Sequence, residues 1–363
     1  FALARLASRP PQDRSLAPLL WVALHQLEHT PAAHYAVVDH AVDCAGSIGG
    51  KAVKRFANAV LRGYLRSRSE IQAAAKRDDE ARFSYPRWWI EKAQSELGPA
   101  AAAVLDSGNL HPPLTLRVNL RKTSVEDYVA QLRGHALDAR VCGVQAVRVE
   151  KPVPVDELPG FRDGLVSVQD AGAQRSAPLL ELAAGQHVVD ACSAPGGKAS
   201  HILELADVDL TALDSDALRL QRVVQNFSRL GVSGRVIHAD AADLDAWWDG
   251  KPVDRVLLDA PCSASGVVRR HPDIKWLRRP ADIARFCAQQ ERLLEALWKV
   301  LARGGKLLYV TCSIFREENQ TQIGGFLSRH ADARHLVGAP GIDGLLLPTE
   351  EHDGFFHALF EKT

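Results

Sequence analysis

Hydrophobic and polar residues change their spacing along the chain, and the first part has helical spacing. Apolar residues recur every three or four positions over Leu16–Leu27, Tyr35–Ala45 and Val53–Leu65, which predicts three amphipathic helices. Residues 69–82 are highly charged and are expected to form a linker. We therefore expect residues 1–82 to be an all-helical domain followed by that linker.

The middle part, residues 83–165, mixes both periodicities. Trp88–Leu97 is expected to be a helix. Beyond it the expected order is strand, helix, strand, strand, over Leu114–Leu120, Ser124–Leu132, Ala139–Cys142 and Ala146–Val149. This order indicates a small α+β unit.

From residue 166 to the end, short apolar strands alternate with helices. The helices are expected over Ala217–Leu230 and Ile283–Ala302. The strands are expected over His187–Ala191, Leu210–Leu213, Arg235–His238, Arg255–Asp259 and Lys306–Thr311. Strands that alternate with helices form a parallel α/β sheet, which binds ligands at the carboxyl ends of its strands.

Composition and charge narrow the class of protein. With 46% hydrophobic and 24% charged residues and no long apolar run, the chain is typical of globular proteins, and we expect no membrane association. The net charge is zero, but residues 1–150 carry 20 basic and 15 acidic side chains. This excess of positive charge favours contact between residues 1–150 and nucleic acid. The six cysteines form no C-x-x-C pair, so we expect neither a metal site nor disulfides, and we expect a cytoplasmic protein. The sequence begins at Phe1 and has no Met, so we expect either that it is incomplete at the N-terminus or that its methionines have been lost.

A turn rich in small residues, Ser193–Gly197, follows the first strand of the α/β part and precedes a helix that starts at Lys198. A phosphate-binding P-loop would need Gly where Cys192 stands and a hydroxyl where Ala199 stands. The dinucleotide fingerprint G-x-G-x-x-G is absent as well. The turn is therefore either a ligand site of another kind or only a turn.

Acidic residues end several of the predicted strands, at Asp190, Asp214, Asp240 and Asp259. Charged groups avoid burial without partners, so a row of carboxylates at one sheet edge favours a ligand site over packing. Asp214 is placed to bind ribose hydroxyls, and Asp240 is placed to accept from an adenine amine or from an adjacent amide. Without a dinucleotide fingerprint, S-adenosylmethionine is the most economical ligand.

Two cysteines, Cys262 and Cys312, follow neighbouring strands within the triplets PCS and TCS. A lone cysteine at such a place is usually a small buried residue. A pair fits thiolate attack on C6 of a pyrimidine, which makes C5 nucleophilic toward a sulfonium methyl group, while a second group assists loss of the C5 proton.

Four segments, VVDACSAPGGKASHILE, DRVLLDAPCSASGVVRRHPDIKW, YVTCSIFREEN and DGFFHALFEK, resemble the RNA (cytosine-5) methyltransferases of the NOL1/NOP2/Sun family. The resemblance covers almost the whole chain, including FANAVLRGYLR and LRVNLRKTS. It implies a class I, Rossmann-like S-adenosylmethionine-dependent methyltransferase core over residues 166–363. It also implies an RRM-like extension over residues 83–165 and a NusB-like RNA-binding domain, lacking its opening helices, over residues 1–82.

The resemblance also implies roles for individual residues. Cys312 would be the nucleophile toward C6, Cys262 would assist product release, and Asp259 would lie between cofactor and base. The implied cofactor contacts are Ala191, Cys192, Ser193, Ala194, Pro195, Gly196, Gly197, Lys198, Asp214, Asp240 and Asp259.

The implied substrate is a cytosine of 16S ribosomal RNA, either naked or in an early assembly intermediate, and a monomeric enzyme is expected. Several polar residues are predicted to contact RNA, namely Arg117, Asn119, Arg121, Arg269, Arg270 and Lys275, with Arg278 and Arg279 beside them. The basic helix over Val53–Leu65 is either a solvated face or a further RNA-facing surface.

Four alternatives remain open from the sequence. The first is an enzyme of the same family that acts on another ribosomal RNA or on transfer RNA. The second is an RNA-binding assembly factor without catalytic activity. The others are a DNA cytosine methyltransferase, which would not explain the TCS triplet, and a small-molecule methyltransferase, which would need neither two cysteines nor accessory domains.

Overall fold

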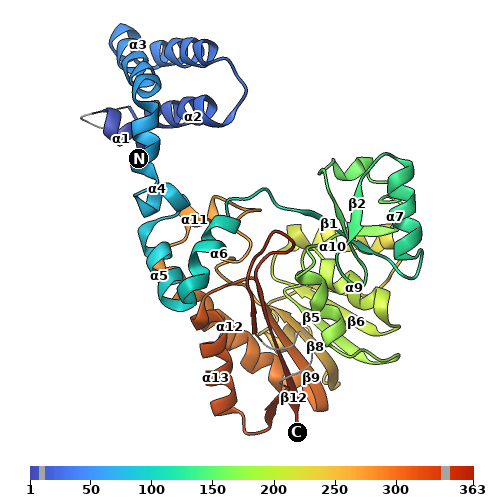
Figure 1. Cartoon of the computed structure of the whole chain (residues 1–363). Helices are drawn as coiled ribbons and strands as arrows, with labels where there is room; N and C mark the ends of the chain where they lie inside the picture. Colours follow the sequence, from blue (N-terminus) through green and yellow to red (C-terminus); the bar gives the residue numbers. More distant parts are fainter. Residues whose placement is uncertain (8–12, 337–343) are drawn as a thin grey trace. The chain divides into compact units, whose positions relative to one another are not determined.

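The computed structural model describes residues 1–7, 13–336 and 344–363, which divide into two units, Phe1–Ile90 and Glu91–Thr363 (Figure 1). None of the helices in the described ranges combines the length and apolar composition needed to cross a membrane.

The first unit is helical, as expected. Its helices are α1 (Ala2–Leu6), α2 (Leu16–His29), α3 (His34–Ala75) and α4 (Asp79–Phe83). Buried Leu20, Val38 and Leu61 belong to a single apolar core. Gly49 and Gly50 have non-helical backbone angles, with φ of +71° at Gly50, so the two helices predicted over residues 35–65 are the arms of one kinked helix.

The linker predicted over residues 69–82 is wrong. Helix α3 continues to Ala75 because Ile71 is buried in the core, and the charged residues lie around it. Glu28 of α2 accepts hydrogen bonds from Tyr64, Arg68 and Gln72, which fastens this end of α3 to α2.

The second unit begins with helices and a small antiparallel sheet. The helices are α5 (Arg87–Leu97), which starts in the first unit, α6 (Ala101–Ser107) and α7 (Val125–Gly134). The strands are β1 (Leu114–Val118), β2 (Ala139–Val141), β3 (Ala146–Val149) and β4 (Val166–Val168), in the order β2-β3-β1-β4. The sequence did not predict β4, which has three residues and lies just beyond the expected boundary at residue 165.

Within the described residues the larger sheet has eight strands. Seven lie in the order β10-β12-β9-β8-β5-β6-β7, and β11 pairs with β12. The five predicted strands are found as β5 (His187–Ala191), β6 (Asp209–Asp214), β7 (Arg235–His238), β8 (Val253–Asp259) and β9 (Leu301–Thr311). They pair in parallel, which confirms the α/β prediction. Three antiparallel strands were not predicted, namely β10 (Ala333–His335), β11 (Gly344–Leu346) and β12 (Phe355–Lys362).

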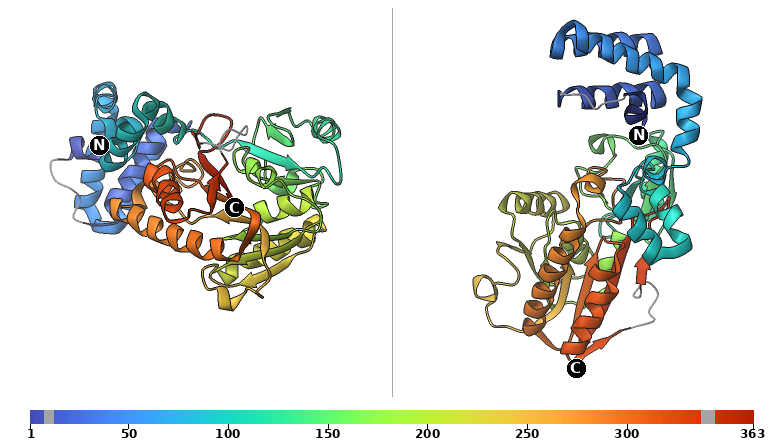
Figure 2. Two further views of the ribbon diagram at one scale, coloured as in Figure 1. Left: turned by 90° about the horizontal axis from the view of Figure 1, so that it is seen from below. Right: turned by 90° about the vertical axis from the view of Figure 1, so that its left-hand side faces the viewer.

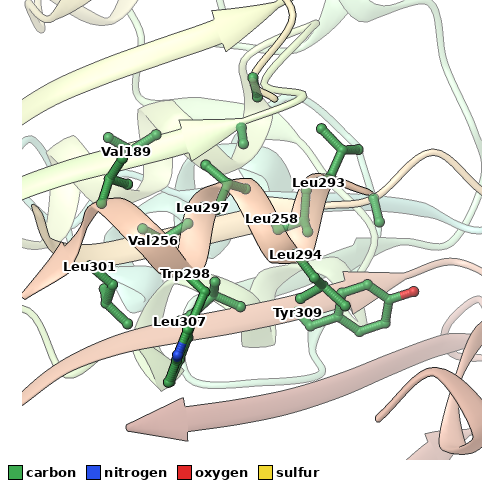
Figure 3. Close-up of a cluster of buried hydrophobic side chains, with 14 of the residues drawn as sticks. Val189, Val256, Leu258, Leu293, Leu294, Leu297, Trp298, Leu301, Leu307 and Tyr309 are labelled. Atoms are coloured by element: carbon green, nitrogen blue, oxygen red, sulfur yellow. The ribbon is translucent and has the colours of Figure 1, made fainter. Parts of the chain in front are cut away.

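Helices cover both faces of this sheet (Figures 1 and 2). They are α8 (Ser176–Leu179), α9 (Gly197–Leu205), α10 (Ala217–Leu230), α12 (Pro280–Val300) and α13 (Gln320–Arg329). The short helix α11 (Ile274–Leu277) comes between β8 and α12 in the chain and lies away from the sheet faces (Figure 1). On the α12 face, Leu293 and Leu297 pack against Val256 and Leu307 (Figure 3). Leu308, the next residue of β9, packs into the core on the other face, so both faces are buried.

Candidate active site

The predicted site residues meet at one edge of the larger sheet because the strands that carry them are neighbours. Strand β5 lies between β6 and β8, and β9 lies beside β8. The four strands are parallel, so the segments that follow them all emerge at their carboxyl ends. These segments are the turn Ser193–Gly197, Asp214, the PCS triplet and the TCS triplet.

The turn after β5 uses most of its own backbone donors. Ser193 N donates to Leu213 O (2.8 Å), Ala194 N to Asp214 Oδ2 (3.0 Å) and Gly196 N to Ser193 O (2.7 Å). Pro195 has no N–H. The donors that this stretch can offer a ligand are therefore the first N–H groups of α9, at Gly197 and Lys198, which have no acceptor within the helix.

Gly196 is required for the shape of the turn. Its φ is +93°, and a Cβ there would lie 3.1 Å from Val223. Only glycine adopts that backbone conformation at little cost. The chain can therefore pass close to α10 and still start α9 at the end of β5.

Asp190 and Asp214 are buried carboxylates beneath the turn. Asp190 accepts from Ser193 Oγ (2.9 Å), while its Oδ1 is buried and has no hydrogen-bond partner among the described residues. Burial, together with the nearby Asp259, raises the pKa of Asp190 to about 7. Asp214 accepts from the backbone at both oxygens, from Ala194 N and Asp216 N, which fixes its orientation.

Lys198 and Asp259 form an ion pair of 2.6 Å between α9 and the end of β8. Burial by itself lowers the pKa of Lys198, but the charge of Asp259 and its hydrogen bond with Lys198 raise it overall, so the side chain is held as a cation. Its Nζ also lies 5.6 Å from the ring centroid of Phe355 on β12. The hydrogen bonds of the described residues use only Oδ2 of Asp259.

Asp240 lies farther along the edge, after β7, and is bound to Arg292 of α12 at 2.7 Å. Burial raises its pKa, but the hydrogen bond from Arg292 outweighs this and the pKa is lowered overall. Asp240 therefore remains ionised and partly exposed.

The two cysteines are in contact, since Cys262 Sγ and Cys312 Sγ lie 3.4 Å apart. Cys262 is buried and Cys312 is partly exposed. The hydrogen bond with Cys312, followed by burial, raises the pKa of Cys262 well above the ordinary value for a thiol. Cys262 is therefore held as a neutral thiol beside Cys312.

A buried polar network under the cysteines joins the loops that carry them. Glu318 Oε1 accepts from Ser263 N (2.8 Å), and its Oε2 accepts from Ser263 Oγ (2.5 Å) and from Ser313 Oγ. Gln290 of α12 donates to both Glu318 and Pro261 O. Each cysteine is thus fixed by its neighbouring serine, and both serines are fixed by one carboxylate.

Glu318 was not identified from the sequence, because Glu317-Glu318 looks like exposed charge. The feature of the sequence that could have identified Glu318 is its position in the segment YVTCSIFREEN, five residues after Ser313. The described ranges contain no group of three or more His, Cys, Asp or Glu side chains that could hold a metal ion.

Comparisons with known sequences show the family to which the chain belongs. The sequence model described as 16S rRNA methyltransferase RsmB/F matches residues 177–361. Two further models match the rest: the ferredoxin-like domain of RsmF/B-type methyltransferases over residues 85–156, and the NusB family over residues 3–66. The chain belongs to the 16S rRNA methyltransferase RsmB/F family. This confirms the resemblance and the fold class inferred from the motifs.

Individual relatives of this family match over nearly the whole chain. Ribosomal RNA small subunit methyltransferase B of Xylella fastidiosa is 44% identical, over 99% of this chain and 85% of the relative. The protein of that name from Pseudomonas putida is 42% identical with the same coverage. Among solved structures, a methyltransferase homologue from Pyrococcus horikoshii aligns with a TM-score of 0.69 and 29% identity, covering 79% of this chain and 98% of its own.

Within this RsmB/F-family fold, three of the residues predicted to contact RNA are instead buried. Arg117 is fully buried, pairs with Glu204 of α9 (2.7 Å) and donates to Gly197 O (2.7 Å). Asn119 is buried and donates to Gly164 O (3.2 Å). Arg269 is buried in an ion pair with Asp353. The RNA prediction is therefore wrong for these three, since burial leaves no surface for phosphate.

The other predicted RNA contacts are engaged to different degrees. Arg121 is partly exposed and pairs with Asp207, and Arg270 pairs with both Asp170 and Asp353. Lys275 is buried beside Asn109 (2.6 Å), and burial lowers its pKa to about 8. Arg278 donates to Ser263 O (3.2 Å), next to Cys262, while Arg279 is exposed. Of this group, Arg278 and Arg279 are therefore best placed to meet RNA near the cysteines.

Proposed function

We propose that this chain transfers a methyl group from S-adenosylmethionine to C5 of a cytosine in 16S ribosomal RNA. The observation that carries the proposal is the pair of thiols 3.4 Å apart, one held neutral and the other partly exposed, beside an ion-paired carboxylate. A methyltransferase that acts on a heteroatom needs no such pair, because its substrate is already nucleophilic.

The residues at the sheet edge fit a sulfonium nucleoside with an amino-acid tail. The buried Asp190 Oδ1 has no described partner and is available to an ammonium group, while the first N–H groups of α9 suit a carboxylate. Asp214 is oriented for ribose hydroxyls, and Asp240 lies farther along for the adenine side. When bound, S-adenosylmethionine supplies an electrophilic methyl group.

The residues of the chain then act in sequence on the cytosine. Cys312 forms a bond from its sulfur to C6, which leaves C5 as the nucleophile that takes the methyl group. Asp259, whose Oδ1 is not used by the described residues, holds the cytosine edge. The C5 proton then leaves to solvent water beside the Cys262 thiol, which assists this step. The electron pair of the C5–H bond restores the C5–C6 double bond as the C6–S bond breaks, and the electrons of that bond return to Cys312 as the thiolate.

The target base must leave its stack to reach the cysteines, as in other enzymes that act on bases. We propose that the NusB-like, RRM-like and methyltransferase parts act together on the RNA, either naked or in an early assembly intermediate, as a cytoplasmic monomer. The names of the relatives support ribosomal RNA of the small subunit as the substrate.

The test is a methyl-transfer assay with isotope-labelled S-adenosylmethionine. Naked 16S RNA, assembled small subunits, transfer RNA and duplex DNA are compared, and the product is digested to nucleosides. We expect label in 5-methylcytidine at one position of 16S RNA. Label in another nucleoside, or only in transfer RNA or DNA, would contradict the proposal.

A further inference from the structure

A cavity of about 630 Å³ lies between the small sheet and the methyltransferase core, apart from the cysteines. The turn between β2 and β3 forms one wall, α8 and the end of α9 form another, and Glu351 and His352 close a side. Its volume is in the range of ligand sites and is large enough for a nucleotide.

The walls are apolar and partly open to solvent. Leu120, Val144 and Leu205 are 51%, 92% and 40% exposed, and all three line this cavity. Single exposed apolar side chains are common on protein surfaces, but several of them around one cavity form a continuous apolar surface. Such a surface indicates a binding site.

A buried acceptor without a partner also lines the cavity. Gln174 is only 6% exposed and donates from Nε2 to Gln169 O (3.0 Å), which fixes the direction of its amide. Its Oε1 is buried and has no hydrogen-bond partner among the described residues. An unsatisfied buried carbonyl oxygen is costly, so this atom points to a ligand that presents an N–H group.

A cation stands beside that acceptor. Arg175, the next residue, lines the cavity and is exposed, and within the described ranges its guanidinium forms no ion pair or hydrogen bond. Most other arginines around the site are paired, so Arg175 is available to an external anion such as phosphate.

We propose that this cavity binds a nucleotide of the substrate RNA other than the target cytosine. A base fits the apolar walls and offers an N–H edge to Gln174 Oε1, and its phosphate meets Arg175. The inference rests on the proposed function, because it takes RNA as the substrate.

The cavity is connected to the cofactor turn by direct hydrogen bonds. Gln174 binds Gln169 O, Gln169 Oε1 accepts from Arg117 Nη1 (2.6 Å), and the same nitrogen donates to Gly197 O (2.7 Å). A nucleotide held in the cavity therefore lies on the same rigid frame as the methyl-donor site, which sets the position of the RNA relative to the cysteines.

The test measures binding of a 16S RNA transcript to the full chain at fixed salt, without S-adenosylmethionine, by filter binding. Val144→Trp fills the cavity without changing charge, and Arg175→Ala removes the cation. The matched controls are Val141→Trp, on the neighbouring strand but not in the lining, and Arg303→Ala, an exposed arginine elsewhere. We expect each cavity variant to weaken transcript binding about tenfold, which corresponds to about 1.4 kcal/mol, and each control to bind as the wild type does.

Equal affinities of cavity and control variants would overturn the inference, as would a wild-type chain that does not bind the transcript. A titration with AMP tests whether the cavity binds a free nucleotide instead of a nucleotide of the RNA. If AMP binds tightly while both cavity variants retain full transcript affinity, the cavity takes a free nucleotide and the inference is wrong. If the cavity variants lose transcript affinity but no methyl transfer to RNA is detected, the proposed function fails while the cavity assignment stands.

Discussion

At the scale of single residues, burial decides which groups of the active site carry charge. Asp190 and Cys262 are both buried at strand ends, and both have raised pKa values. Lys198 is largely enclosed yet stays charged, because Asp259 pairs with it. The site therefore combines a neutral thiol, an acid that is half-protonated near neutral pH and a permanent ion pair.

Asp190 should make stability depend on pH. Its folded pKa of about 7 lies above the ordinary value of about 3.9, so the folded state keeps a proton that the unfolded chain has lost. Stability from this group is present below pH 4 and is lost as the pH rises to 7. We predict that the free energy of unfolding of Asp190→Asn, measured with urea relative to that of the wild type, increases by a few kcal/mol from pH 5 to pH 8. The reason is that the wild type loses stability over this range and the asparagine variant does not. An equal difference at both pH values would show that the carboxylate is not buried in this way.

Glu318 should position both cysteines. Glu318→Ala removes the acceptor of Ser263 and Ser313, and buried donors left unpaired cost about 1–3 kcal/mol each. We predict lower stability and a kcat reduced at least about tenfold, with S-adenosylmethionine affinity unchanged in calorimetry. Glu317→Ala is the control, because that side chain is half-exposed and paired only at the surface. A normal kcat in a folded Glu318→Ala variant would refute the positioning role.

The residues proposed to react were easier to predict from the sequence than the residues that hold them in place. Cys262, Cys312 and the glycine turn stand out because each is an unusual residue at a strand end. Glu318 does not, since its role depends on Ser263, 55 residues earlier in the chain. Arg117, Asn119 and Arg269 were misassigned for a related reason: their buried partners, such as Glu204 and Asp353, are far away in the sequence.

At the scale of elements, helix α9 is tied to the small sheet at both ends. Arg117 of β1 binds Gly197 O at its start and Glu204 in its last turn. The sheet thereby fixes the helix whose first N–H groups face the proposed methyl donor.

Arg117→Ala should weaken binding of the methyl donor. The change leaves Glu204 buried without its partner, which typically costs about 3–5 kcal/mol, and releases the start of α9. We predict about tenfold weaker S-adenosylmethionine binding by calorimetry, with a lower Tm. Arg133→Ala, which removes an exposed arginine of α7, should change both by little. Unaltered donor affinity in folded Arg117→Ala would disprove the coupling.

Elements with clear periodicity were predicted well, and others were missed for physical reasons. Ala217–Leu230 and Arg235–His238 match the structure residue for residue. Strand β12 was missed because six of its residues in a row are buried, so no alternation marks it. The end of α3 was missed because charged residues surround its single buried Ile71.

At the scale of the whole molecule, the chain divides into units with separate apolar cores. The core of the first unit contains Leu20 and Leu61, and those of the second are built on the two sheets. Units with their own cores are expected to fold independently.

A fragment that begins at Asp78, the N-cap of α4, should therefore fold and bind S-adenosylmethionine with wild-type affinity. We predict that it binds the 16S transcript more weakly, since the basic arm of α3 is removed. Circular dichroism and calorimetry on the fragment provide the check. An unfolded fragment would mean that the first unit is needed for stability and not only for RNA.

The central claim is that Cys312 attacks the base and Cys262 releases it. The most direct measurement is electrophoresis under denaturing conditions after each alanine variant has reacted with labelled 16S transcript and S-adenosylmethionine. The account predicts a protein–RNA adduct that survives denaturant with Cys262→Ala, because release is blocked, and none with Cys312→Ala. An adduct with Cys312→Ala and none with Cys262→Ala would reverse the two roles and contradict the account.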